Sequence, residues 1–238
     1  MIHLITYGDE VFKNSKKRLF NEARRTGWFD TLTVYGPSNI DDKFKEQFKD
    51  ILKNKKGAGF WIWKPYFIKK RLSEINENDI LIYMDAGCSI NPKGVERFKE
   101  YIDMLNKSEE SIISFQMSHH PEKKWTTKEI FDNFSVGYNS RIANSGQIIA
   151  TVIPLKKNKD SQSLINRWLN ILSNNPKLFT DYYNENQEEY FKENRHDQSV
   201  FSLIRKKNDT ILIEDETFFL DYNTIEALKS PFWATRKK

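Results

Sequence analysis

The chain has 238 residues, of which 38% are hydrophobic and 30% are charged. This length suits one α/β domain with a core of ordinary size, and a 14% share of aromatic residues is too high for a disordered chain. The net charge of +5 is spread among interleaved acids and bases, which argues against a surface dedicated to nucleic acid. Cys88 is the only cysteine, so an intrachain disulfide and a zinc site built from cysteines are both excluded.

The sequence contains neither a candidate membrane span nor a secretory signal, and these two observations predict the cellular location of the protein. No stretch approaches the roughly 18 apolar residues of a membrane span, and residues 1–6 lack the basic start and long apolar core of a secretory signal. We therefore expect a cytoplasmic protein. Arg236, Lys237 and Lys238 would allow peripheral contact with anionic lipid at the inner face of a membrane, although three charges attract only weakly.

Strand-like and helix-like patterns alternate along the first half of the chain. In order, they predict a strand at 2–7, a helix from 12 to 26, a strand at 31–35, helices at 41–53 and 65–75, a strand at 80–84, a helix at 92–105 and a strand at 111–115. Gly27 is placed to end the first helix. Trp61 and Trp63 alternate within a strand-like stretch before Pro65, which suits the first turn of a helix.

The second half is less regular. Residues 119–138 are polar and aromatic with at most one short helix, and they are followed by a strand-like segment at 144–153, a helix around 164–172, a helix at 197–204 and a strand at 210–213. Alternating strands and helices predict an α/β fold with a mostly parallel central sheet flanked by helices. We expect one domain over 1–238, with a nucleotide-binding half at about 1–115 and an acceptor-facing half at about 116–238.

Asp85 follows the apolar run 80–84 directly and precedes Ala86 and Gly87. In open α/β sheets ligands bind at the carboxyl ends of the strands, and a carboxylate leaving a buried strand needs a partner. A hard cation shared with phosphate oxygens is one such partner, and Gly87 would allow a diphosphate to approach the backbone. An ordinary aspartate turn after a strand is the alternative interpretation.

Two segments in this region resemble small bacterial or viral glycosyltransferases of the GT-A type. They are Gly59-Phe60-Trp61-Ile62-Trp63-Lys64-Pro65-Tyr66 and Asp79-Ile80-Leu81-Ile82-Tyr83-Met84-Asp85-Ala86-Gly87. In that superfamily an aromatic-rich helix precedes a strand that ends in Asp-x-Asp, which binds Mn²⁺ or Mg²⁺ and the donor. Ala143-Asn144-Ser145-Gly146-Gln147 resembles the later strand beside the sugar, and Arg195-His196-Asp197-Gln198 resembles the acidic motif at a helix start.

The resemblance implies a GT-A-like (Rossmann-like) fold and a sugar-transfer reaction from a nucleotide-diphosphate sugar, with a UDP-sugar favoured. It also implies a glycan or lipid-linked acceptor, and a role in surface polysaccharide synthesis. This chain departs from the pattern in two ways. Gly87 stands where the second aspartate would be, and no histidine follows His196 as a late metal ligand. Metal binding would then rest on Asp85 with donor oxygens and water.

Site residues follow from these segments. The base and ribose are expected near Thr6, Tyr7 and Asp9, although core packing is an equal alternative for Tyr7. The other expected donor contacts are Trp63, Lys64, Asp85, Ala86, Gly87, Asn144, Ser145, Gly146 and Gln147. Lys64 would either reach a phosphate or be a solvated lysine at a helix start.

Acceptor contacts are expected from His119 and Trp125, because sugars stack on aromatic faces, with a His-His-Pro surface turn as the alternative. His196 would orient the acceptor or be a surface histidine. Asp197 would act as the general base of an inverting reaction, or would be the N-cap of the helix that follows it.

Three other functions compete with this interpretation. A sugar nucleotidyltransferase should carry a glycine-rich, arginine-containing loop after the first strand, where this chain has Tyr7-Gly8-Asp9-Glu10-Val11. A dinucleotide-binding oxidoreductase would need a G-x-G-x-x-G element, which the sequence lacks. A basic module that binds nucleic acid or membrane lipid without catalysis would need clustered lysine and arginine.

Overall fold

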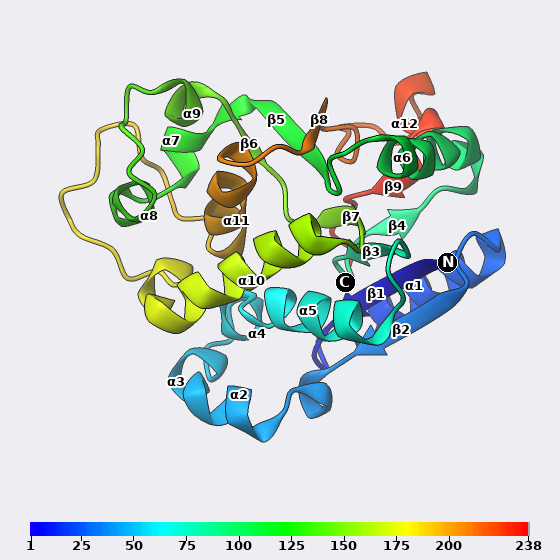
Figure 1. Ribbon diagram of the computed structural model, residues 1–238, viewed down its shortest axis with the longest axis horizontal. Coiled ribbons are helices and arrows are strands. Elements are labelled where there is room, and N and C mark those ends of the chain that lie inside the picture. The colour runs from blue at the N-terminus through cyan, green and yellow to red at the C-terminus, as the bar shows by residue number, and fades with distance from the viewer. Residues whose placement is uncertain (238) are drawn as a thin grey trace.

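A four-stranded sheet with the strand order β2-β1-β3-β7 lies at the centre of the computed structural model, which describes residues 1–237 (Figure 1). β1 pairs in parallel with both β2 and β3, and β7 pairs antiparallel with β3. The four strands are β1 (Ile2–Tyr7), β2 (Thr31–Tyr35), β3 (Ile80–Met84) and β7 (Val152–Lys156). This arrangement confirms the predicted α/β class and the mostly parallel central sheet.

Helices cover both faces of this sheet because its strands are apolar on both sides. Leu4 and Ile82 point into one core with helices α1 and α6, whereas Ile5 and Leu81 point into the other with α5 and α10. The helices are α1 (Lys13–Thr26), α5 (Trp63–Glu74), α6 (Val95–Lys107) and α10 (Lys159–Asn174). Gly27 ends α1 with a left-handed φ of 67°, as predicted.

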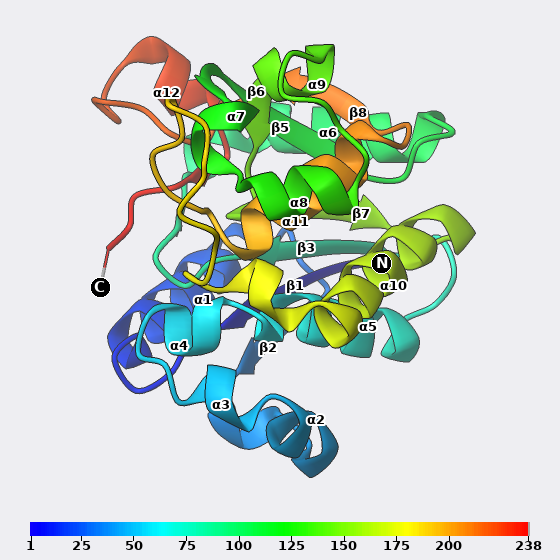
Figure 2. The same ribbon diagram turned by 90° about the vertical axis from the view of Figure 1, so that its left-hand side faces the viewer.

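A second sheet packs above the first, as Figure 2 shows. β5 (Ile113–Pro121) is its middle strand, antiparallel to β6 (Gly146–Ile148) and parallel to β8 (Ile211–Glu214). A single bridge between Ile112 and Leu155 connects the two sheets. A two-stranded ladder of β4 (Ser89–Ile90) and β9 (Phe232–Trp233) lies beside them.

The remaining elements are short. They are α2 (Asp42–Gln47), α3 (Lys49–Leu52), α4 (Gly57–Phe60), α7 (Glu122–Trp125), α8 (Lys128–Asn133), α9 (Arg141–Asn144), α11 (Asp197–Lys206) and α12 (Ile225–Lys229), with 3₁₀ turns η1 (Pro37–Asn39), η2 (Pro92–Gly94) and η3 (Pro176–Phe179).

Four predictions about the elements are wrong in their details. The segment 119–138, expected to hold at most one short helix, contains both α7 and α8. The helix predicted at 41–53 divides at Phe48, and the strand predicted at 144–153 divides into the end of α9, β6 and the start of β7. The stretch around Trp61 is not strand-like. Gly59 has a φ of 95°, and Trp61 a φ of 59°. A Cβ at position 59 would lie 2.9 Å from the Cα of Leu52, so close packing of α4 on α3 requires glycine there.

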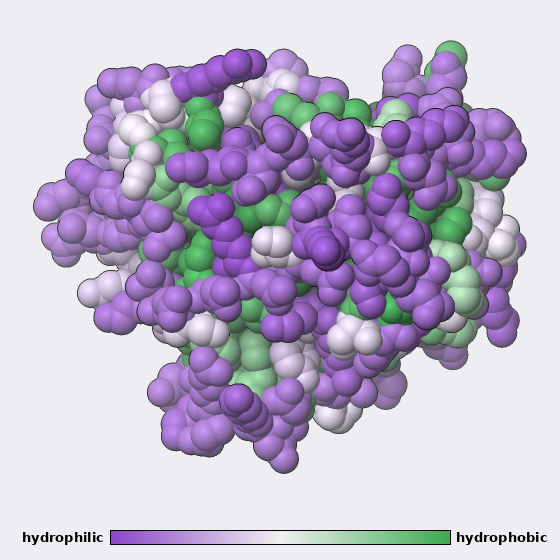
Figure 3. Space-filling view, viewed as in Figure 1, coloured by the Kyte–Doolittle hydropathy of each residue, from purple (hydrophilic) through white to green (hydrophobic). Residues whose placement is uncertain are grey.

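The face seen in Figure 1 is mostly hydrophilic, with apolar groups in small separate patches (Figure 3). Within residues 1–237, none of the helices has the length and apolar character needed to cross a membrane.

Candidate active site

The carboxyl ends of β1 and β3 lie side by side at one edge of the central sheet. β1 leads through α1 to β2 on one side and pairs with β3 on the other, so the strand order reverses between β1 and β3. In open α/β sheets such a reversal is the usual position of the ligand-binding crevice. Tyr7-Gly8-Asp9 leaves β1 and Asp85-Ala86-Gly87 leaves β3 at this crevice.

Lys64, in the first turn of α5, connects the residues of this edge. Its Nζ lies 2.9 Å from Asp197 Oδ2 and 3.3 Å from Asp85 Oδ1, and it donates to the carbonyl oxygen of Ala150 at 2.9 Å. The side chains of Lys64 and Asp197 are 3% and 4% exposed, whereas that of Asp85 is 29% exposed. We call Lys64, Asp85 and Asp197 the triad. Asp85 is the member of the triad whose side chain is partly exposed at this edge of the sheet. The solvated lysine considered from the sequence is wrong.

Charge pairing sets the protonation of the triad. Burial would lower the pKa of Lys64, but the carboxylates of Asp197 and Asp85 outweigh burial and raise it. Burial raises the pKa of Asp197 to about 6, although Lys64 opposes this effect. Burial and the Asp85 carboxylate raise the pKa of Tyr83 well above its ordinary value. The Tyr83 hydroxyl therefore stays protonated and donates to Asp85 Oδ1.

A chain of amide hydrogen bonds connects the triad to the second sheet. The Ala150 N–H donates to Gln198 Oε1 at 3.0 Å, and Gln198 Nε2 donates to Gln147 Oε1 at 2.6 Å. Gln147 is fully buried, so the predicted direct contact between Gln147 and the donor sugar is not supported. Gln147 instead holds Gln198, which follows Asp197 at the start of α11.

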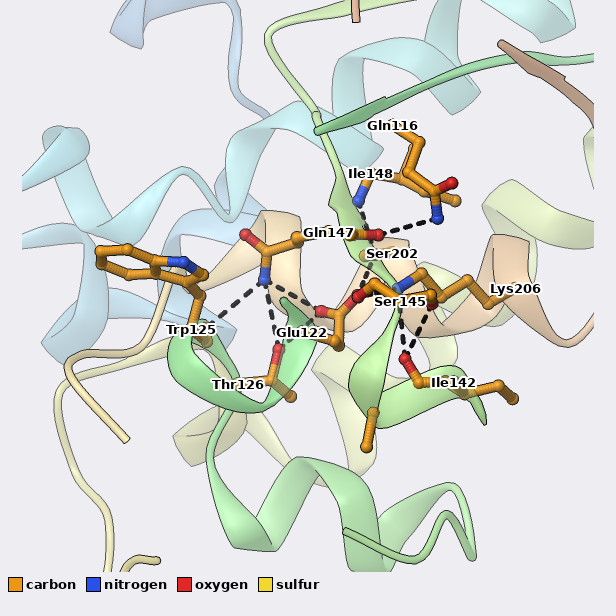
Figure 4. A network of polar contacts seen from close by, with 12 residues as sticks. Gln116, Glu122, Trp125, Thr126, Ile142, Ser145, Gln147, Ile148, Ser202 and Lys206 are labelled. Carbon is orange, nitrogen blue, oxygen red and sulfur yellow. Dashed lines mark hydrogen bonds and ion pairs between the residues drawn. The ribbon is translucent and has the colours of Figure 1, made fainter. Parts of the chain in front are cut away.

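Gln147 also belongs to a buried polar network around Glu122, shown in Figure 4. Glu122 is 0% exposed and lies 2.7 Å from the Nζ of Lys206. It accepts hydrogen bonds from the side chains of Thr126, Gln147 and Ser202. This network fixes α7, β6 and α11 to one another, and thereby fixes where α11 begins.

The segment 234–237 lies over the loop at Gly87. The Lys237 N–H and the Thr235 hydroxyl both donate to the Gly87 carbonyl oxygen, at 3.0 Å and 2.9 Å. The Lys237 carbonyl oxygen accepts from Ser15 in α1 at 3.1 Å. Figure 2 shows this red segment running from the upper part of the molecule down to the end marked C, at the height of α1.

Tyr7 and Trp63 are core residues. Their ring centroids are 3.9 Å apart, and Phe67 packs on Tyr7 at 5.3 Å. The two side chains are 3% and 4% exposed. The predicted stacking of Tyr7 on a base, and the predicted contact of Trp63 with the donor, are therefore not supported by this packing.

Thr6 and Asp9 retain unused polar atoms near the crevice. Thr6 Oγ1 and Asp9 Oδ1 are buried, and neither has a hydrogen-bond partner within residues 1–237. A buried polar atom without a partner is costly, so a ligand that reached these two atoms would relieve that cost. Their place beside the nucleoside stays a prediction.

The other predicted donor residues in the segment 144–146 are held by local contacts. Asn144 Nδ2 donates to the Ser140 carbonyl oxygen, and Ser145 Oγ donates to that of Ile142. A Cβ at Gly146 would lie 2.2 Å from the Met117 carbonyl oxygen, so this glycine serves the close pairing of β6 with β5.

The predicted acceptor residues differ in their exposure and contacts. His196 is 3% exposed, its Nε2 lies 2.7 Å from Asp181 Oδ1, and Phe60 packs on its ring. Burial lowers its pKa. The predicted acceptor contact of His196 is therefore not supported. His119 is exposed, and Trp125 is partly exposed beneath the Arg195 guanidinium, 4.3 Å from the ring centroid.

Asp197 is not the N-cap of α11. The cap is His196, with a φ of 56° and no capping hydrogen bond from its side chain, and Asp197 is the first helical residue. Its carboxylate is directed to Lys64 instead. The capping alternative is therefore wrong, and the role as general base stays a prediction.

No protein-family model matches the chain, and no curated protein matches it by sequence. Solved structures do match. A glycosyltransferase involved in glycosylation of the major capsid of PBCV-1 aligns with a TM-score of 0.53 and 11% identity, over 98% of this chain and 91% of that one. Mouse xyloside xylosyltransferase 1 aligns with a TM-score of 0.50 and 10% identity, over 98% and 97%. The galactosyltransferase LgtC aligns with a TM-score of 0.53 and 9% identity, over 91% and 75%.

The chain has the GT-A glycosyltransferase fold. This confirms the fold expected from the resemblance. At identities of 9–11%, the likeness establishes the architecture, and the chemistry has to be argued from the site.

A divalent cation is expected in many GT-A sites, but the residues at this edge do not fit one. Asp85 Oδ1 is already engaged by Tyr83 and Lys64, and Gly87 supplies no second carboxylate. Within residues 1–237, no three His, Cys, Asp or Glu side chains are grouped as metal ligands would be. Because the Lys64 ammonium already offsets the charge of the Asp85 carboxylate, a cation would be repelled by Lys64 at this position, so no step is assigned to a metal.

Three participants in this GT-A site were missed by sequence analysis. Tyr83 looks like any apolar strand residue, and Ala150 contributes only its backbone. Gln198 was quoted in the motif with Asp197 but given no role. The position of Gln198 next to Asp197 was the one feature of the sequence that could have indicated its place in the site.

Proposed function

We propose that the chain is a glycosyltransferase that moves a sugar from a nucleotide-diphosphate sugar to an acceptor hydroxyl. The observation that carries this proposal is the triad at the crevice between β1 and β3, where Lys64 pairs with both Asp85 and Asp197. The GT-A fold supports it, because ligands of such open sheets bind at this edge. By the resemblance in sequence, we further propose a UDP-sugar donor, a glycan or lipid-linked acceptor, and a role in surface polysaccharide synthesis.

Each triad residue has a distinct part in the proposed reaction. Asp85, which is partly exposed, contacts the donor. Lys64 is buried and holds both carboxylates in place, so we assign it a positioning role, and we propose Asp197 as the general base. The acceptor oxygen bonds to the anomeric carbon while the bond from that carbon to the diphosphate oxygen breaks. The acceptor loses its proton to a base, and the nucleoside diphosphate leaves with the bonding electron pair.

A thermal-shift screen tests the proposal directly. The protein would be heated with UDP, GDP, CMP and their sugar conjugates, once with Mn²⁺ and once with EDTA. A ligand that binds the native state stabilises it by about 2.7 kcal/mol at a hundredfold excess over its Kd. We expect a nucleotide diphosphate to raise the Tm. No response to any nucleotide would contradict the proposal.

Asp85→Asn tests the residue at the centre of the site. The amide keeps an oxygen for Tyr83 but loses the charge, so transfer from the donor identified in the screen should fall by at least about a hundredfold, with little loss of stability because Lys64 keeps Asp197. Asp50→Asn is the matched control, since the Asp50 side chain is 82% exposed on α3. Equal activity in the two folded variants would contradict the role of Asp85.

A further inference from the structure

The diphosphate of a nucleotide-sugar needs positive charge that Lys64 cannot supply. An ammonium group has three N–H donors. Lys64 Nζ donates to Ala150 O at 2.9 Å and lies within ion-pair distance of Asp197 Oδ2 and Asp85 Oδ1, at 2.9 and 3.3 Å. Its charge is also shared between two carboxylates. A leaving diphosphate at this edge must therefore be neutralised by other groups.

The segment 234–237 brings two cations to the loop that would otherwise carry a metal ligand. Arg236 and Lys237 are both exposed, while the backbone around them is held by hydrogen bonds to Gly87 and Ser15. Thr235 is fixed further by its hydroxyl, 3.0 Å from that of Ser89. The backbone is thus anchored while both charged side chains stay exposed, with the Arg236 guanidinium 5.7 Å from the centroid of the Phe218 ring.

Gly87 is what allows this approach. A Cβ at position 87 would lie 3.3 Å from the Cα of Arg236 and 3.4 Å from the Lys237 carbonyl oxygen. An aspartate side chain there would occupy the space that the segment 234–237 now fills. The absence of a carboxylate at position 87 therefore permits the close packing of the basic segment 234–237.

We propose that Arg236 and Lys237 bind the diphosphate of the donor and take the place of a divalent cation. The proposal rests on the proposed function, because it names how that site recognises its donor. Arginine and lysine neutralise phosphate charge through charge-assisted hydrogen bonds. The consequence is a transferase whose donor binding does not depend on metal.

Calorimetric titration with UDP, UMP and uridine in EDTA tests this proposal. The wild-type protein should bind UDP more tightly than UMP. The double variant Arg236→Ala/Lys237→Ala should lose about tenfold in UDP affinity for each cation removed, given about 1.5 kcal/mol for a hydrogen bond to a charged group. Its uridine affinity should be unchanged. Lys69→Ala/Lys93→Ala, which removes the same charge from two exposed lysines, should bind UDP like the wild type.

The outcomes separate this inference from the function on which it rests. If UDP binds only when Mn²⁺ is added, or if the two double variants bind UDP equally, the inference is overturned and the proposed function stands. If no nucleotide binds with Mn²⁺ or with EDTA, both are overturned. Gly87→Ala provides a second measurement, because the added methyl group pushes on Arg236 and should weaken UDP binding in EDTA but not uridine binding.

Discussion

Lys64 is 2% exposed, a burial that a charged lysine tolerates only with partners. Two carboxylates and one carbonyl oxygen supply them here. Burying this group would otherwise cost several kcal/mol, so the three contacts explain why a lysine can occupy the first turn of α5 within the core. They also couple α5 to β3 and to α11 through one side chain.

Replacing Lys64 with methionine should destabilise the protein strongly. Asp197 would be left buried without its counter-charge, and breaking a buried ion pair typically costs about 3–5 kcal/mol. Chemical denaturation measures this free energy of unfolding. Lys69→Met, on the exposed side of the same helix, should change it by less than about 0.5 kcal/mol. Similar values for the two variants would contradict the buried pairing.

The raised pKa of Asp197 predicts how stability depends on pH. The folded-state pKa is about 6 and the ordinary value is 3.8, so between these values the folded protein binds more protons than the unfolded chain. This contribution to the free energy of unfolding is therefore full below about pH 4, is lost as pH rises to about 6, and stays absent above that. Asp197→Asn should remove this dependence, which denaturation of both proteins from pH 4 to 7 would measure.

Activity should also depend on the protonation of Asp197, but it should fall, not rise, as the pH is lowered. Below about pH 6 Asp197 becomes protonated, its pairing with Lys64 weakens, and kcat/KM should fall. A profile that is flat from pH 7 down to pH 5 would mean that the charge of Asp197 is not needed for transfer.

At the scale of elements, α11 is fixed by polar contacts as well as by its apolar face. Glu122 of α7 pairs with Lys206 at 2.7 Å, and both side chains are buried. Burial lowers the pKa of Lys206, and Glu122 opposes this effect. Because Ser202 and Gln147 bond to the same carboxylate, the network determines the position of α11 relative to β6.

A double-mutant cycle on Glu122 and Lys206 should show strong coupling. Glu122→Gln and Lys206→Met would each leave a buried group without its partner, so the double variant should be more stable than the summed single effects predict by at least about 1 kcal/mol. The exposed pair Asp103 and Lys107, at 2.9 Å on α6, is the matched control. Its coupling should stay below about 0.5 kcal/mol, and equal coupling in the two cycles would contradict the network.

At the scale of the whole molecule, one core joins the two predicted halves. Ile5 and Leu81 from the first half share a cluster of buried residues with Trp168 and Phe201 from the second. The rings of Trp168 and Phe201 stack at 3.9 Å. The second cluster of buried residues comes mainly from the first half, and Ile149, Val152 and Phe232 of the second half complete it, so both cores contain residues of both halves.

The chain should therefore unfold in one cooperative transition. Far-ultraviolet circular dichroism, which follows the helices, and tryptophan fluorescence, which follows the core, should give coincident denaturation curves. Two separated transitions would instead indicate that residues 1–115 and 116–238 are independent domains, and would contradict the predicted single domain.

The sequence by itself determined the elements that local patterns encode. The strands 2–7, 31–35 and 80–84, the end of α1 at Gly27 and the place of Asp85 after β3 all follow from apolar periodicity and turn residues. These features depend on neighbours within a few residues, so a single sequence suffices to predict them.

The partners of the site residues were decided only by the tertiary structure. Lys64 and Asp197 are 133 positions apart, and no local pattern marks their pairing, or the packing of the segment 234–237 on Gly87. Whether a polar side chain is buried with a partner or left to a ligand depends on how the whole chain folds. For that reason the position of the site was predictable from the sequence, but the arrangement of charges within it was not.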